Sequence, residues 1–402
     1  MNELSSLGLI LLFALFAGHL VKFLRIPEVT GYILAGVMVG PSVLGWVSHR
    51  NLSALSVFSE VALGLILFSL GAVFEFERLA RVGRRLVRIT LMESAAAALL
   101  VTGGMLLFGQ PWQMAFLLGA TAMATAPAST LMVLRECNAS GPLTETLTGI
   151  VGLNNIYCMT GFTLVAAALD LSQRAAGGAL LQTLYESLYP LAWQLIGSVA
   201  LGFLVGLLLA AWSTKVVEHG ELTILLIGCM LLCVGVAVLL ELSTLIATMT
   251  VGATLTNLSA DSRRMYAALS RTDPPFYAIF FVIAGADLNL ALLWTIGLRG
   301  MVYVVGRAVG KFLGARLGAR REGLPEAVQR WLGFGLMSQA GLAIGLTLVI
   351  NRRFPEFGPK VATVVLSAVI VYEIIGPISA RFAVVRSGEA QPRAPEPVGA
   401  IL

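Results

Sequence analysis

Long apolar segments that contain very few charges are the feature that most constrains the fold of this chain. Of the 402 residues, 57% are hydrophobic and only 12% are charged, whereas soluble domains carry about 25% charged residues. A helix needs about 20 apolar residues to cross a bilayer. The sequence therefore predicts an all-α polytopic membrane protein with thirteen spans, at residues 6–24, 29–47, 55–74, 87–108, 112–136, 144–169, 187–213, 221–240, 242–257, 275–290, 293–317, 329–350 and 361–385.

The distribution of basic residues predicts the orientation of these spans. Cytoplasmic loops are enriched in Lys and Arg. If the N-terminus lies outside and the spans alternate, most of the 27 Lys and Arg residues fall in cytoplasmic segments. An outside N-terminus and a cytoplasmic C-terminus require an odd number of spans, which agrees with thirteen. We expect a multi-pass protein of the bacterial inner (plasma) membrane.

Two of the predicted spans carry helix-breaking residues at mid-membrane. The fifth contains Pro127 among four hydroxyl residues, and the twelfth contains three glycines between residues 333 and 341. Proline removes a helix hydrogen bond. Interrupted helices at corresponding places in two halves of opposite orientation are typical of inverted-repeat transporters. We therefore expect inverted repeats with two interrupted helices that cross, broken near residues 122–128 and 335–341.

Several motifs, in order along the chain, resemble those of the Kef-type and NapA-type monovalent cation:proton antiporters. They lie at residues 26–41, 64–71 with the acidic 74–77, 124–136 with 141–144, 306–315, 338–345 and 372–377. The resemblance covers the chain from about residue 5 to residue 385. It implies the sodium/proton antiporter fold for a transmembrane domain at residues 1–386.

The same resemblance implies how this domain is divided and assembled. Scaffold helices would form a homodimer, for which the first span offers Phe13, Phe16 and Phe23, and a moving core would comprise helices near residues 87–170 and 293–385. The transported ion is expected at the crossing. The residues that we expect to bind it are Asn154, Asn155, Thr121, Thr125, Ala126, Ser129, Ser338 and Gln339, with Arg307, Lys311 and Glu373 as charge-compensating or titrating groups.

The expected ion site departs from the family pattern in one respect. The family has Asp-Asp or Asn-Asp on the helix after the first interrupted one, where this chain has Asn154 and Asn155. A buried cation needs a compensating charge, and antiport needs a group that titrates. Asparagine supplies a carbonyl oxygen but does not titrate. The two residues are therefore interpreted either as neutral ion ligands or as hydrogen-bonding residues that stabilise the crossing.

The remaining intramembrane charges are candidates for function. Arg307 and Glu373 are predicted to lie at nearly the same depth, which favours a structural ion pair between them. Lys311 would then lack a partner, and would either titrate or extend its ammonium to the cytoplasmic face. Glu93 is expected to pair at the membrane surface with Arg88.

Five functions remain open from the sequence. The first is uncoupled or weakly coupled transport of Na⁺ or K⁺ on the antiporter scaffold, and the second is anion-selective transport with Lys311 titrating. The others are transport coupled through another acid, a passive channel or uniporter, and a non-transporting sensor subunit. No enzyme, cofactor, metal or nucleic-acid motif is found; the expected partners are a monovalent ion (Na⁺, K⁺ or H⁺) and the lipid bilayer. The polar tail 387–402 is expected to be disordered and is too short for a nucleotide-binding domain, so regulation by nucleotide would need a separate subunit.

Overall fold

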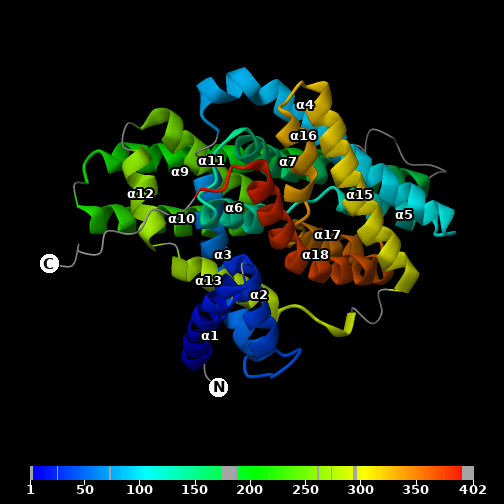
Figure 1. Cartoon of the computed structure of the whole chain (residues 1–402), viewed down its shortest axis with the longest axis horizontal. Helices are drawn as coiled ribbons and strands as arrows, with labels where there is room; N and C mark the ends of the chain where they lie inside the picture. The colour runs from blue at the N-terminus through cyan, green and yellow to red at the C-terminus, as the bar shows by residue number, and fades with distance from the viewer. Residues whose placement is uncertain are drawn as a thin grey trace.

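The computed structural model describes residues 3–24, 26–71, 74–173, 186, 188–216, 218–259, 262–272, 274–292 and 297–391, and its regular elements there are all helical. Figure 1 shows them packed as a bundle. In chain order they are α1 (Glu3–Phe23), α2 (Glu28–Val39), α3 (His49–Gly71), α4 (Phe76–Leu107), α5 (Trp112–Ala122), α6 (Pro127–Glu136), α7 (Pro142–Gln173), the π-helical turn η1 (Trp193–Gly197), α9 (Ser198–Ser213), α10 (His219–Leu239), α11 (Thr244–Leu258), α12 (Ser262–Thr272), α13 (Pro274–Ala286), α15 (Gly297–Arg321), α16 (Glu326–Gly335), α17 (Gly341–Arg353) and α18 (Gly358–Ser387).

The predicted spans coincide with these helices. Seven segments of the described chain are long and apolar enough to cross a membrane, and four shorter apolar helices accompany them, namely α2, the end of α3, α11 and α13. The eleventh predicted span is α15, whose basic residues make it less apolar. The prediction of an all-α polytopic fold is confirmed.

Two spans are broken at the positions that the sequence predicts, and the breaks meet. The first break separates α5 from α6, which begins at Pro127, and the second separates α16 from α17, which begins at Gly341. The backbone N–H of Ala126 in the first break donates a 3.0 Å hydrogen bond to the Ser338 carbonyl in the second. Thr130 Oγ1 also lies 3.3 Å from the Gly335 carbonyl. The predicted crossing of two interrupted helices is therefore present.

The helices pack in two groups around this crossing. In one group α2 packs against α1 and α13, and α3 packs against α11 and α13. In the other, α15 packs against α4 and α16, while α18 packs against α16 and α17. The second group contains helices from both segments, near residues 87–170 and 293–385, that the resemblance assigns to a moving core. It contacts the first group through α6 and α18, which touch α2.

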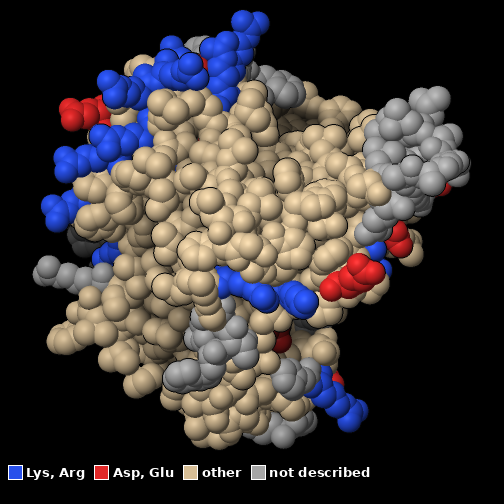
Figure 2. Space-filling view, turned by 90° about the vertical axis from the view of Figure 1, so that its right-hand side faces the viewer, with Lys and Arg blue, Asp and Glu red and all other residues tan. Residues whose placement is uncertain are grey.

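Basic side chains gather at one end of the molecule. The start of α4, the end of α15 and the start of α16 meet at the upper end in Figure 1, opposite the N-terminus. Figure 2 shows Lys and Arg concentrated at the same end. Arg88 of α4 pairs there with Glu322, at 3.3 Å. This asymmetry fits the charge distribution on which the orientation was predicted.

The first residues of the predicted disordered tail are ordered. Helix α18 continues to Ser387 and ends at Gly388, which has a left-handed backbone. The Glu389 carboxylate accepts hydrogen bonds from the backbone N–H groups of Leu143 and Thr144, at 2.6 and 2.7 Å. These donors lie in the first turn of α7, where N–H groups lack partners within the helix. The prediction of disorder is therefore wrong for 387–391, and 392–402 lie outside the described residues.

Glycines bring α15 against α4. A Cβ at Gly310 would lie 2.5 Å from Ala97 Cα, and one at Gly314 would lie 2.6 Å from Glu93 Cα. Small residues spaced four apart allow such close approach between membrane helices. Gly310 and Gly314 flank Lys311 on α15, so this contact sets the distance between Lys311 and Glu93.

Gly310→Leu is expected to destabilise the fold by about 1–3 kcal/mol, because the added side chain must separate α15 from α4. Gly103→Leu in α4 is the matched control, since a Cβ there meets nothing within 4 Å. Thermal unfolding of the purified variants in detergent measures both changes. Equal unfolding temperatures for the two variants would contradict this account of the α4–α15 contact.

Candidate functional site

A fully buried ion pair lies beside the crossing. Lys311 Nζ is 2.6 Å from Glu93 Oε2, and neither side chain is exposed. The ammonium also donates to the Met123 carbonyl at 2.6 Å and to Thr125 Oγ1 at 2.9 Å, both in the first break. Lys311 thus links α4 to the interrupted helix. The expectation that Lys311 lacks a partner is wrong.

Asn154 extends this pair to α7. Its Nδ2 donates to Glu93 Oε1 at 2.6 Å and to Ser94 Oγ at 3.0 Å. The Ser94 hydroxyl donates to the same carboxylate oxygen, at 3.0 Å. An amide can donate in this way, whereas an ionised aspartate cannot and would repel Glu93. Asn154 therefore stabilises the Glu93 carboxylate, which the sequence predicts at the membrane surface and not at this site.

Arg307, one turn before Lys311, binds the two breaks directly. Its guanidinium donates to the Ala124 carbonyl at 2.6 Å, and to the carbonyls of Met337 and Ser338 at 2.8 and 3.1 Å. These carbonyls follow the C-terminal ends of α5 and α16, where a helix carries partial negative charge. The guanidinium carbon also lies 4.2 Å from the centroid of the Tyr372 ring.

The predicted Arg307–Glu373 pair does not form. Both side chains are buried, but the donors of Arg307 point to the broken helices, and Glu373 lines a cavity on another face of α18. Residue spacing predicts nearly equal depths for Arg307 and Glu373, but it does not predict the direction in which each side chain extends from its helix. The predicted Glu93–Arg88 pair is wrong as well, because Arg88 bonds Glu322 and Glu93 lies deeper in the bundle.

The structure brings most of the predicted site residues to the crossing. Gln339 Nε2 donates to the Thr121 carbonyl at 3.0 Å and to the Tyr303 hydroxyl at 2.8 Å. Ala126 bonds Ser338 through the backbone. Ser129 and Asn155 are buried. Glu373 is the predicted residue that lies apart from this set.

Several buried oxygen atoms at the site lack a hydrogen-bond donor. They belong to five side chains that are predicted at the site. They are the Oδ1 atoms of Asn154 and Asn155, the hydroxyls of Ser129 and Ser338, and Gln339 Oε1. Buried polar atoms are normally satisfied, so unsatisfied acceptor oxygens are candidate ligands for a cation.

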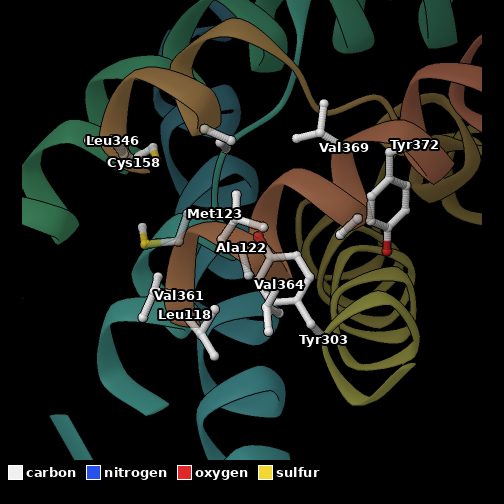
Figure 3. Close-up of a cluster of buried hydrophobic side chains, with 14 of the residues drawn as sticks. Leu118, Ala122, Met123, Cys158, Tyr303, Leu346, Val361, Val364, Val369 and Tyr372 are labelled. Atoms are coloured by element: carbon white, nitrogen blue, oxygen red, sulfur yellow. The ribbon is translucent and has the colours of Figure 1, made fainter. Parts of the chain in front are cut away.

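Apolar side chains enclose this polar centre. Figure 3 shows Leu118, Ala122 and Met123 at the end of the broken helix α5, with Cys158 of α7 and Val364 of α18 near them. All five are buried. The surroundings of the Glu93–Lys311 pair are therefore of low dielectric. An uncompensated charge would be strongly unfavourable there.

Glu93 is the functional candidate that the sequence analysis missed. Glu93 lies only five residues after Arg88, the last arginine of a basic run, and this position predicts a place at the membrane surface. Two signals were available: a carboxylate within an otherwise apolar span, and glycines on both sides of Lys311 that permit a close helix contact.

Comparison with known proteins identifies the family. Residues 8–386 match the family described as "Sodium/hydrogen exchanger, transmembrane". The chain belongs to this family. The match covers both broken helices and the whole Glu93–Lys311 site.

The chain is also similar to two transport proteins of known name. The ammonium/H(+) antiporter subunit AmhT of Alkalihalophilus pseudofirmus is 24% identical over 344 residues, which cover 85% of each chain. The glutathione-regulated potassium-efflux system protein KefC of Klebsiella pneumoniae is 27% identical over 77% of this chain. The chain spans 49% of the length of that KefC protein.

Solved structures of an exchanger share the fold. The sodium proton antiporter MjNhaP1 of Methanocaldococcus jannaschii at pH 8 superposes with a TM-score of 0.71 at 16% identity, covering 96% of this chain and 98% of that one. A second MjNhaP1 structure, an electron-microscopy map, gives a TM-score of 0.73 over 97% and 99% of the two chains, also at 16% identity. The sodium/proton antiporter fold is thereby established.

Removing one charge of the buried pair should destabilise the protein far more than removing both. Glu93→Gln leaves the Lys311 ammonium unpaired, at an expected cost of about 3–5 kcal/mol. The double variant Glu93→Gln/Lys311→Met removes both charges and should recover most of this loss. Thermal unfolding at constant detergent concentration measures the three proteins. A double variant less stable than Glu93→Gln would contradict the pairing.

Proposed function

We propose that this protein exchanges a monovalent cation for protons across the membrane, with Glu93 as the carboxylate that holds the cation. The observation that carries the proposal is the fully buried Glu93–Lys311 pair at the crossing of the broken helices. Membership of the sodium/hydrogen exchanger family supports the reaction class.

Coupling follows from charge balance at this pair. Glu93 carboxylate and Lys311 ammonium together are neutral. A cation that binds Glu93 adds one positive charge to a dry site, which is strongly unfavourable unless another charge leaves. Loss of one proton from Lys311 restores neutrality, because the amine then remains beside a carboxylate–cation pair. Cation binding and proton release are thus linked.

Neutral ligands complete the proposed cation site. The unsatisfied oxygens of Asn154, Asn155 and Ser129 replace water around the ion, while Glu93 supplies the charge. Asn154 would release the Glu93 carboxylate and present Oδ1 to the cation. The two asparagines then act as ligands next to a carboxylate on a different helix.

The structure removes the reason for proposing uncoupled or anion-selective transport, two hypotheses that the sequence left open. Both hypotheses assumed that the crossing carries no negative charge of its own. Glu93 provides that charge, 2.6 Å from Lys311. The relatives reported above include an ammonium/H(+) antiporter subunit, and the structural neighbour is a sodium proton antiporter.

The proposed cargo is an alkali cation or ammonium. The relatives are named for ammonium/H(+) antiport and potassium efflux, and the structural neighbour for sodium/proton antiport. A carboxylate with neutral oxygens suits each of these monovalent cations. We further propose the predicted orientation, with the basic end of Figure 2 in the cytoplasm, and a homodimer formed through scaffold helices such as α1, whose Phe16 and Phe23 are exposed.

Reconstituted vesicles with an imposed Na⁺, K⁺ or NH₄⁺ gradient and an internal pH dye test the exchange. The parent protein should move protons against at least one of these cations. Glu93→Gln/Lys311→Met should abolish cation-dependent proton movement, because both the carboxylate that holds the cation and the ammonium that releases the proton are gone. This double variant is the informative one, since it avoids an unpaired buried charge.

The matched control is Glu322→Gln, which removes a carboxylate from the Arg88 pair at the basic end of the molecule. It should exchange at a rate close to that of the parent. Proton movement that persists undiminished in the double variant would show that the coupling group lies elsewhere.

The orientation has its own test. A cysteine placed at the exposed Gln391, with the four buried native cysteines replaced, should react with an impermeant maleimide only after the cytoplasmic face is opened. Labelling from the periplasmic side of intact cells would contradict the proposed orientation.

A further inference from the structure

A second buried carboxylate lies in a cavity away from the Glu93 site. Glu373 on α18 is 4% exposed. Within the described part of the chain it makes neither a hydrogen bond nor an ion pair. It lines a cavity of about 440 Å³, whose walls also include Ser59, Asp287, Gly341 and Leu366. A buried carboxylate without a partner is unfavourable unless a cation or a proton neutralises it.

The cavity offers further oxygen atoms. The Ser59 hydroxyl on α3 is buried and also lacks a hydrogen-bond partner. Asp287, just after α13, adds a second carboxylate, and Asn289 follows it on the same wall. Carboxylate, hydroxyl and amide oxygens are ligands suited to a hard cation. The remaining lining is mostly apolar, which strengthens attraction between the carboxylates and a cation.

Among the described residues, no Lys or Arg side chain forms an ion pair with Glu373. Arg307 lies under the Tyr372 ring and donates its protons to three carbonyls of the broken helices. The residues that line the cavity include Glu373 and Asp287 as charged groups, and no Lys or Arg is among them. A compensating positive charge would therefore come from solution.

We propose that this cavity is a second cation-binding site, in which Glu373 holds a monovalent cation. It would serve the exchange proposed above, but binding there does not require Glu93. Its walls come from α3 and α13 of one helix group and from α17 and α18 of the other. A displacement of one group against the other would therefore open or close it.

The position of the cavity suits a site that a cation occupies before it reaches the crossing of the broken helices. Ala340 and Gly341 line it, directly after Ser338 and Gln339 of the second break. Another cavity, of about 270 Å³, lies between α3, α6 and Tyr277. Along α3, Ser59 of the first cavity and Leu70 of the second are about 16 Å apart, at 1.5 Å per residue. The two cavities thus lie at different depths of the same interface.

Cysteine chemistry in the cavity tests the proposal. Leu366→Cys, in a protein whose four buried cysteines are replaced by alanine, should react faster with a cationic methanethiosulfonate than with an anionic one, by about tenfold. Saturating Na⁺, K⁺ or NH₄⁺ should slow the cationic reaction. Ile344→Cys, which lines the same cavity, is the second reporter if the first variant fails to fold.

Glu373→Gln should remove both the charge preference and the protection by cations. The exposed Glu60, next to Ser59 in the sequence, supplies the matched control, and Glu60→Gln should leave both effects unchanged. Gly341→Met should also remove protection, because a side chain there extends into open space and would fill the cavity while Glu373 remains.

The outcomes separate this proposal from the proposed function. In the Glu93→Gln/Lys311→Met background, cation protection of Leu366→Cys should persist although exchange is lost. Protection that survives Glu373→Gln, equal rates for both reagents, or no reaction at either reporter would overturn the second site. Protection that disappears with the Glu93 pair would mean that the cavity belongs to the site already described.

Discussion

The buried pair of Glu93 and Lys311 is the interaction on which the rest of the site depends. Two opposite charges lie 2.6 Å apart with neither side chain exposed, and burying such a pair is tolerated only if each partner also has hydrogen bonds. Thr125 and the Met123 carbonyl supply them for Lys311, and Asn154 and Ser94 supply them for Glu93. The pair thereby joins α4, α7 and α15 to the first broken helix.

A single helix, α15, carries both basic side chains that reach the crossing of the broken helices. Arg307 and Lys311 are one turn apart on α15, so they extend from the same face. Arg307 binds the carbonyls of Ala124, Met337 and Ser338 in the two breaks. Lys311 binds a different carbonyl, that of Met123, and Glu93. Arg307 has acceptors that do not titrate and therefore stabilises the crossing. Lys311 is paired with the Glu93 carboxylate, which can bind a cation in place of the Lys311 ammonium.

Much of the fold could be predicted from the sequence, because bilayer thickness fixes helix length and Pro127 and Gly341 mark the breaks. The pairing of charges could not be predicted. Sequence spacing gives the depth of a residue in the membrane, whereas pairing depends on the rotation of each helix about its axis. Glu93 and Lys311 meet because Gly310 and Gly314 let α15 approach α4. Arg307 and Glu373, predicted at similar depth, do not meet, because Arg307 binds the broken helices and Glu373 lines a separate cavity.

The asparagines at positions 154 and 155 illustrate the same limit. Considered along the chain alone, they suggest that the site has lost its carboxylate. In three dimensions Asn154 donates a 2.6 Å hydrogen bond to the carboxylate of Glu93 on α4. The negative charge of the site therefore comes from Glu93 on α4 and not from α7. The neutral Asn154 amide beside it avoids the repulsion that a second carboxylate would cause.

The number of protons released when the purified protein binds its cation tests the central claim most directly. In weakly buffered detergent solution, addition of Na⁺, K⁺ or NH₄⁺ should release about one more proton per parent protein than per Glu93→Gln/Lys311→Met variant, because a cation at Glu93 replaces the charge of the Lys311 ammonium. Equal proton release by the two proteins, with the cation bound by both, would contradict the account.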